Sequence, residues 1–260
     1  MLHSLRRLFT RARHSPGSYF YPPYCIFCGE MGRGPVCDTC ILAFSVVSPP
    51  ICQRCGKPLK TGYERESCPH CSSRRGRDWY VDAARSLFVY RGTARHSLHR
   101  FKYSRRRILG RYFAEQLLAH FGGLSGLAAH FGWDPADAPA CIVPLPLHPL
   151  KRFRRGFNQN ELVLQFYAPP LGLPVASGLL RRVRNTRSQV GLGASDRFRN
   201  VRNAFAVPPR MLPQVENRSV LLFDDLITTG ATVNAAARAL KSAGAKKVYA
   251  LSLFTASLKG

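Results

Sequence analysis

Short apolar runs alternate with amphipathic stretches along the chain from residue 81 onward. Apolar runs bounded by turn residues are typical of buried strands, and apolar residues three or four positions apart are typical of helices. The pattern predicts helices at 93–121, 158–166 and 233–243 and strands at 81–90, 141–147, 175–180, 204–207, 220–223 and 248–254. Because strands and helices alternate, we expect an α/β fold with a mainly parallel sheet flanked by helices on both faces.

The remaining segments divide the chain into three parts. Residues 1–20 have the composition of a flexible basic tail, 21–78 hold a cysteine-rich module that ends in a charged linker, and 79–260 hold the α/β domain. Within the domain, the Gly-, Ala- and Pro-rich stretch 122–139 has no clear assignment. The Arg-rich stretch 181–203 is too long and too charged for a simple turn, so we interpret it as a functional loop.

The charge of the chain is strongly positive. Thirty-nine Lys and Arg residues face 14 Asp and Glu residues, which gives a formal net charge of +25 and a pI near 10.6. Such a field attracts polyanions, whether nucleic acid, an anionic membrane surface or a phosphorylated metabolite. A high-GC genome, which favours Arg over Lys, is an alternative source of part of this excess.

The sequence also favours a cytoplasmic location. The N-terminus is basic but has no apolar segment behind the charges, so it does not resemble a signal peptide. No stretch approaches the roughly eighteen apolar residues of a spanning helix, so we expect no membrane span. In the cytoplasm, clustered cysteines are more often metal ligands than disulfide partners.

Eight of the nine cysteines form four Cys-x-x-Cys pairs within one short segment. A two-residue spacer lets both thiolates of a pair face one tetrahedral ion, so four pairs predict two closed structural zinc sites. Sequential and interleaved pairings both use all eight thiols; we favour the sequential one because its loops are shorter. His70 could replace one thiolate as a ligand, but we interpret it as a bystander. Cys141 lies in an apolar run that predicts a core position. The predicted ligands are Cys25, Cys28, Cys37, Cys40, Cys52, Cys55, Cys68 and Cys71.

The segment 219–232 runs from an apolar strand through two acids and a hydroxyl-rich turn into a helix. In open α/β sheets, ligands bind at the carboxyl ends of strands, where Asp224 and Asp225 lie. Paired carboxylates accept hydrogen bonds from neighbouring sugar hydroxyls, and a helix N-terminus favours a phosphate. The alternative is an N-cap followed by a solvated turn. The predicted phosphate-binding residues are Thr228, Thr229, Gly230, Ala231 and Thr232.

This segment resembles the ribose-5-phosphate loop of type I phosphoribosyltransferases. Further segments strengthen the likeness: Val143-Pro-Leu-Pro-Leu-His148, Arg155-Gly-Phe-Asn-Gln159, Thr186-Arg-Ser-Gln-Val-Gly-Leu192 and Arg199-Asn-Val-Arg-Asn-Ala-Phe205. Together with the double zinc-ribbon-like segment before them, they resemble the ComF family, which is associated with DNA uptake in natural transformation. One departure is Ser104-Arg-Arg-Arg107, where relatives often carry an acidic residue.

The resemblance implies a type I phosphoribosyltransferase-like fold and a role for each matching residue. Asp224 and Asp225 would hold the ribose of 5-phosphoribosyl-1-pyrophosphate, and 228–232 its 5-phosphate. Pro146, Leu147 and His148 match the pyrophosphate loop, with Arg155, Asn158 and Gln159 just beyond it. Magnesium would arrive with the pyrophosphate. The zinc module would dock a helicase-like or recombination protein.

Two basic regions add further candidates. In the Arg-rich stretch 181–203, we choose Arg184, Arg187 and Gln189 as catalytic candidates that would stabilise charge on the pyrophosphate. The basic helix at 91–111 contains Phe101 and Tyr103, and basic side chains beside aromatics suit single-stranded DNA. A helix with a solvated basic face and aromatics in its core has the same pattern, and both interpretations stay open.

Two functions therefore follow from the sequence. The first is a phosphoribosyltransferase-like protein that binds phosphoribosyl pyrophosphate and acts in DNA uptake, with turnover on an acceptor that the sequence does not name. The second is a non-enzymatic adaptor that binds single-stranded DNA and uses the sugar-phosphate site for sensing or stability.

Overall fold

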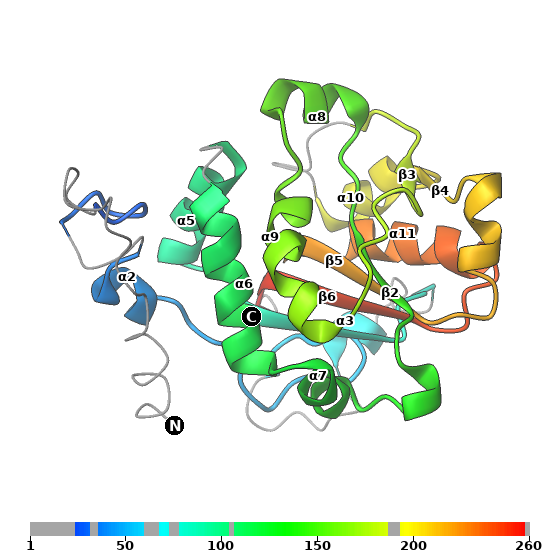
Figure 1. Cartoon of the computed structure of the whole chain (residues 1–260), viewed down its shortest axis with the longest axis horizontal. Helices are drawn as coiled ribbons and strands as arrows, with labels where there is room; N and C mark the ends of the chain where they lie inside the picture. The colour runs from blue at the N-terminus through cyan, green and yellow to red at the C-terminus, as the bar shows by residue number, and fades with distance from the viewer. Residues whose placement is uncertain are drawn as a thin grey trace.

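A four-stranded parallel sheet forms the centre of the computed structural model, which describes residues 24–31, 36–59, 68–72, 78–103, 107–186 and 193–257 (Figure 1). Its strand order is β1-β6-β5-β2, and each neighbouring pair is parallel. The strands are β1 (Ala83–Val89), β2 (Cys141–Pro144), β5 (Val220–Ile227) and β6 (Val248–Thr255). The predicted parallel sheet is therefore confirmed.

Helices cover both faces of the sheet, as predicted. Alternate residues of β5 face opposite ways: Leu221 and Phe223 join one apolar core, and Val220 and Leu222 join the other. The first core includes side chains of α5 (Thr93–Tyr103), α6 (Arg107–Phe121), α7 (Leu124–Phe131) and α9 (Gln159–Tyr167). The second includes side chains of α11 (Ala231–Ser242) and α10 (Ala194–Val201). All-parallel strands require this double cover because both of their faces are apolar.

The cysteine-rich segment packs against the same sheet. Its residues 45–47 lie along the outer edge of β1, where Val47 N–H donates to Leu87 O at 2.8 Å and Val89 N–H donates to Ser45 O at 2.8 Å. The short helices α2 (Asp38–Leu42) and α3 (Pro69–Ser72) belong to this segment. Pairing at this edge leaves fewer backbone groups of β1 open to another chain.

The stretch 145–218 holds the largest differences from the predicted elements. Of the predicted strand 175–180, only Val175 forms a bridge, to Ile142, because a turn follows directly. The expected loop 181–203 contains β3 (Arg181–Arg182) and α10, and β3 pairs antiparallel with β4 (Phe205–Ala206). The helix α10 was missed because its polar and charged residues hide the few positions, such as Val201, that face the core.

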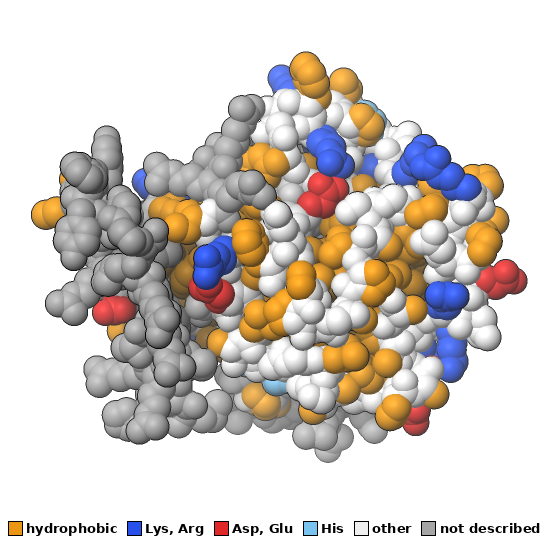
Figure 2. Space-filling model, viewed as in Figure 1, with side chains coloured by type: hydrophobic (Ala, Val, Ile, Leu, Met, Phe, Trp, Pro, Cys, Tyr) orange, Lys and Arg blue, Asp and Glu red, His pale blue; other side chains and the backbone are white. Residues whose placement is uncertain are grey.

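Short helices complete the chain. The helix α8 (Pro149–Arg155) projects from the body of the domain, where Figure 2 shows basic and apolar side chains close together. The stretch 122–139 contains α7 and the 3-10 helix η3 (Pro135–Asp137), and two further 3-10 helices are η4 (Pro169–Leu171) and η5 (Pro209–Gln214). The predicted helical region 93–121 forms two helices, α5 and α6.

A close contact between α6 and α9 sets the position of the helix that reaches the end of β5. A Cβ atom placed on Gly110 of α6 would lie 2.6 Å from Leu162 Cγ and 2.8 Å from Leu162 O of α9. The second of these atoms is backbone and cannot rotate away. Gly110 therefore lets the two helices approach closely enough to bury their shared apolar face.

We expect Gly110→Ala to lower stability although alanine is the better helix former. Overpacking costs about 1–3 kcal/mol, and each kcal/mol lowers the Tm of a domain of this size by about 2–4 °C. Thermal unfolding measures the effect. Gly123→Ala is the control, because a Cβ there meets no atom within 4 Å. Equal Tm values for the two variants would contradict the close contact.

Candidate functional site

Two adjacent acids lie near the carboxyl end of β5, and neighbouring helices contact both. Asp225 is 4% exposed, and its Oδ2 accepts a hydrogen bond from Gln159 Nε2 at 2.7 Å. Lys102 Nζ of α5 lies 3.2 Å from the same oxygen. The charge of Asp225 is therefore balanced by one cation and one amide from two different helices.

The negative charge of Asp224 is less well balanced by neighbouring groups than that of Asp225. Its Oδ1 accepts from Asn160 Nδ2 at 3.2 Å and from Asp225 N–H at 2.9 Å. Burial, and then repulsion from Asp225, raise the pKa of Asp224 to about 7. Among the described residues, no hydrogen-bond partner reaches Asn160 Oδ1. The raised pKa of Asp224 gives the site a carboxyl group that can change its charge near neutral pH.

A threonine-rich turn joins β5 to α11 beside the acids. Gly230 occupies the N-cap position of α11 with a φ of +74°, and a Cβ there would lie 2.2 Å from the Trp79 ring. Glycine is required here by both the backbone angle and the close ring. Thr229 Oγ1 accepts from Ala231 N–H at 3.4 Å. Such a helix start, with its partial positive charge, suits an anion.

The loop after β2 faces the same end of the sheet. Pro146, Leu147 and His148 are half-buried there, and His148 Nδ1 accepts from Leu150 N–H at 3.3 Å, so the imidazole caps α8. Asn158 caps α9 and donates to Leu145 O at 3.3 Å, which directs its amide to the backbone rather than to the acids. Arg155 donates to Gln159 Oε1 at 3.2 Å. Gln159 is thus the predicted residue that links this loop to the acid pair.

Within the described residues, the member of the Arg-rich stretch that reaches the site is a residue other than Arg184. Arg184 is exposed and donates to Arg202 O at 2.6 Å, and Arg187 and Gln189 lie outside the described residues. Arg197 of α10, in contrast, donates to Thr228 Oγ1 at 3.2 Å. The guanidinium of Arg197 therefore lies beside Thr228, the first residue of the threonine turn.

Lys102, Asn160 and Lys57 are site contacts that sequence reasoning missed. Lys102 lies within the predicted basic helix at 91–111, and it contacts Asp225. Asn160 directly follows the predicted Gln159, and its place in the first turn of a helix was the available signal. Lys57 donates to Thr228 O at 2.6 Å from within the cysteine-rich segment, and its position right after Cys55-Gly56 carried no indication of this contact.

The basic helix at 91–111 does not present Phe101 to a nucleic acid. Phe101 is 1% exposed and belongs to the first apolar core, so at this residue the interpretation of a core aromatic beneath a basic face holds. The side chain of Tyr103 lies outside the described part of the chain. Stacking on bases would therefore need aromatics elsewhere.

The eight paired cysteines form two compact clusters in the predicted sequential pairing. Cys25, Cys28, Cys37 and Cys40 make the first cluster and Cys52, Cys55, Cys68 and Cys71 the second, with sulfurs within 4.8 Å of one another in each. Neighbouring Sγ atoms lie 3.6 Å apart for Cys28 and Cys37 and 3.7 Å apart for Cys55 and Cys68. A tetrahedral ion with Zn–S bonds of about 2.3 Å requires about 3.8 Å. The clusters fit two closed zinc sites, and Cys141 is a buried core residue as predicted.

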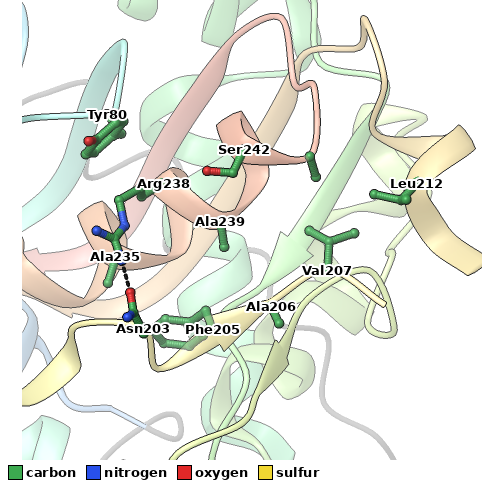
Figure 3. Close-up of a pocket in the computed structure, with 11 residues that line it drawn as sticks. Tyr80, Asn203, Phe205, Ala206, Val207, Leu212, Ala235, Arg238, Ala239 and Ser242 are labelled. Carbon is green, nitrogen blue, oxygen red and sulfur yellow. Dashed lines mark hydrogen bonds between the residues drawn. The ribbon is translucent and has the colours of Figure 1, made fainter. Parts of the chain in front are cut away.

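A pocket of about 530 Å³ lies away from the acids, between the outer side of α11 and β4 (Figure 3). Its lining includes small and apolar side chains such as Ala239, Val207 and Leu212. Arg238, its one charged lining residue, is hydrogen-bonded to Asn203. Because this pocket has neither an acid nor a helix N-terminus, the end of β5 is the better candidate for phosphate and sugar chemistry.

The chain resembles known families in both of its parts. A double zinc ribbon domain matches residues 18–72, and a phosphoribosyl transferase domain matches residues 169–257. In the described structure, no helix combines the length and apolar character of a membrane span.

Several relatives align with most of the chain, among them proteins from three different genera. Competence protein F of Haemophilus influenzae is 29% identical over 88% of this chain and 95% of its own length. The DNA utilization protein YhgH of Salmonella typhi is 31% identical over 87% of this chain and 94% of its own. Competence protein ComFC of Bacillus subtilis is 27% identical over 85% of this chain and 82% of its own.

The raised pKa of Asp224 predicts that stability falls as pH rises. Between the ordinary value of 3.8 and the folded value of about 7, the folded state binds a proton that the unfolded state releases. Asp224→Asn removes this titration and keeps an oxygen acceptor. Relative to the wild type, the free energy of unfolding of the variant should rise by about 1 kcal/mol between pH 6 and pH 8.5, measured by urea unfolding.

Asp137→Asn provides a control of opposite sign. A hydrogen bond from Lys246, at 2.7 Å, lowers the pKa of Asp137, so its carboxylate supports folding and its loss should not stabilise the protein at pH 8.5. A difference between Asp224→Asn and the wild type that does not change with pH would contradict the raised pKa.

Proposed function

Because the chain belongs to the ComF family of competence and DNA utilization proteins, we propose that it binds 5-phosphoribosyl-1-pyrophosphate at the end of β5 and acts in DNA uptake. The observation that carries the proposal is the juxtaposition of Asp224 and Asp225 with a threonine turn at the start of α11. Carboxylates that can accept hydrogen bonds from two sugar hydroxyls thus lie a few residues away from backbone amides that can donate to a phosphate.

Each part of the donor has a matching group. The ribose hydroxyls donate to Asp224 and Asp225, and the 5-phosphate is held by Thr228, Thr229, Gly230, Ala231 and Thr232 at the helix start. The pyrophosphate occupies the turn formed by Pro146, Leu147 and His148, with Arg155 and Gln159 behind it. Arg197, which touches Thr228 Oγ1, supplies positive charge on the phosphate side.

Binding of the donor also changes the electrostatics of the acid pair. In the free protein, Lys102 and Gln159 occupy Asp225 Oδ2. Sugar hydroxyls that approach the pair stabilise its charged form, which lowers the pKa of Asp224. Magnesium would accompany the pyrophosphate, since it prefers phosphate and carboxylate oxygens, and the carboxylates of Asp224 and Asp225 at the same end of the sheet would help to hold it. The metal would neutralise charge on the leaving group.

Transfer of the phosphoribosyl group to an acceptor is a further step that this geometry permits. A bond from the acceptor atom to the anomeric carbon would form while the bond from that carbon to pyrophosphate breaks, and the acceptor's proton would pass to solvent. Arg184, Arg187 and Gln189 would stabilise the charge that develops on the departing pyrophosphate. Positioning and charge stabilisation are sufficient for such a reaction, so no strong general base is required. Donor-dependent release of pyrophosphate is its signature.

We expect phosphoribosyl pyrophosphate with magnesium to raise the Tm of the zinc-loaded protein. A ligand at a hundred times its Kd stabilises the folded state by about 2.7 kcal/mol. The double variant Asp224→Asn, Asp225→Asn should lose this shift, whereas Asp137→Asn, far from the turn, should keep it. Differential scanning fluorimetry over a ligand series provides the measurement. A wild-type protein whose Tm does not respond to saturating ligand would remove the proposal.

A second candidate function is binding of single-stranded DNA, and α8 is the observation that favours it. Phe153 is 86% exposed on this short projecting helix, and its neighbours in the helix include Lys151, Arg152, Arg154 and Arg155. An exposed aromatic among cations suits a base stacked above a phosphate backbone. The helix lies near the pyrophosphate turn, so one strand could approach the sugar-phosphate site.

Phe153→Ala should weaken binding of an oligothymidine strand by about 1 kcal/mol or more, because one stacking contact is lost. Leu150→Ala is the matched control, since Leu150 is a second exposed apolar residue of α8 that has no ring. Fluorescence anisotropy at several salt concentrations separates stacking from phosphate contacts, whose number sets the slope of the log–log plot. Equal losses in both variants would show that α8 offers no stacking platform.

A further inference from the structure

We propose that Lys57 is a positioning residue through which the second cysteine cluster holds the threonine turn 228–232 in its binding shape. Lys57 follows Cys55 by two residues and is 3% exposed. The inference rests on the proposed function, because it assigns a support to the turn that would bind the 5-phosphate. It requires no contact between Lys57 and the ligand.

The ammonium group of Lys57 joins the ends of two central strands. Its Nζ donates to Thr228 O at 2.6 Å and to Ala256 O at 2.8 Å. Ala256 N–H in turn donates to Ile227 O at 3.0 Å. Thr228 is the first residue of the turn, so Lys57 restrains the point at which the backbone leaves β5. Hydrogen bonds from a charged donor are among the stronger ones in proteins.

Lys57 belongs to the zinc knuckle 52–57, which Cys52 N–H closes by donating to Lys57 O at 2.9 Å. This knuckle is itself fixed to β1. A Cβ on Gly56 would lie 2.1 Å from Ala84 O, so this knuckle touches the strand directly. Ala84 N–H donates to Arg54 O at 2.8 Å, and Arg85 Nη1 donates to Gln53 O at 2.8 Å. Lys57 therefore lies on a segment that is hydrogen-bonded to β1 and held in place by the sheet.

A second tie runs from the same knuckle to the far side of the turn. Arg54 Nη2 donates to Trp79 O at 2.9 Å, and the Trp79 ring lies against Gly230. Asn234, in the first turn of α11, donates to Asp78 O at 2.8 Å and accepts from Tyr80 N–H at 2.6 Å. The turn is thus held at Thr228 by Lys57 and at Gly230 by the segment that leads into β1.

Charge explains why a lysine is tolerated at this depth. A zinc ion held by four thiolates carries a net charge of about −2, and the second cluster lies directly beside Lys57 in the chain. A buried cation beside a buried anionic centre is far less costly than either alone. Binding of zinc and the position of Lys57 are therefore linked, and the first cluster, which packs on the other core, has no such link to the turn among the described residues.

Hydrogen–deuterium exchange on the full zinc-loaded chain, without any ligand, tests the inference. Lys57→Met removes the donor and keeps most of the side-chain length, so we expect amides of 228–232 to exchange roughly tenfold faster while those of β5 and β6 stay protected. Lys246→Met is the control, because Lys246 also donates to a backbone carbonyl, that of Ala136, but at the surface. Unchanged exchange at 228–232 would overturn the inference.

A second variant covers the case in which Lys57→Met loses its fold, recognised by rapid exchange in β1, β5 and β6 alike. Lys57→Arg keeps the charge but replaces the compact ammonium by a larger planar group that does not fit between the two carbonyls in the same way. A folded Lys57→Arg protein should show faster exchange confined to 228–232. If its exchange matches that of the wild type, Lys57 does not position the turn.

Ligand binding separates this inference from the proposed function. If wild-type protein binds phosphoribosyl pyrophosphate, the looser turn of Lys57→Met should raise its Kd about tenfold at unchanged zinc content. A wild type that binds no donor refutes the proposed function alone, because the exchange result stands without ligand. Faster exchange with an unchanged Kd would overturn the claim that Lys57 sets the binding shape.

Discussion

Repulsion between two neighbouring, largely buried carboxylates is the constraint around which one end of the sheet is built. Asp224 and Asp225 follow an apolar strand and cannot move apart. Lys102 and Gln159 stabilise one of them, and the other keeps a raised pKa. Stability is thereby given up at this end of the sheet, which is the usual relation between a functional site and its scaffold.

Supports for this end of the sheet come from parts of the chain that are far apart in sequence. The helix α9 supplies Gln159 and Asn160, α5 supplies Lys102, and the second cysteine cluster supplies Lys57. Close packing at Gly110 fixes α9 against α6. The cysteine-rich segment is therefore part of the structure that shapes the site.

Local patterns in the sequence were enough to predict the parallel sheet, the acids at its carboxyl end and two clusters of four cysteines, whereas only the shorter loops favoured the sequential pairing that the structure shows. Each of these depends on residues close together in the chain: an apolar run before Asp224, or a two-residue spacer between thiols. The helices α8 and α10 were missed because polar and charged residues dominate both and few of their residues face the core. The contacts of Lys57 and Lys102 could not be predicted, since each joins residues more than a hundred positions apart and nothing near either lysine specifies its direction.

The strand order has a consequence for how the chain acquires its structure during synthesis. β6 lies between β1 and β5, so β1 has no neighbouring strand within the sheet until residues 248–255 have left the ribosome. The pairing of Ala83 with Tyr249 spans most of the chain, and such distant pairings form slowly. The cysteine clusters precede β1 and can therefore take up metal first, in a nascent chain whose sheet is still open at its centre.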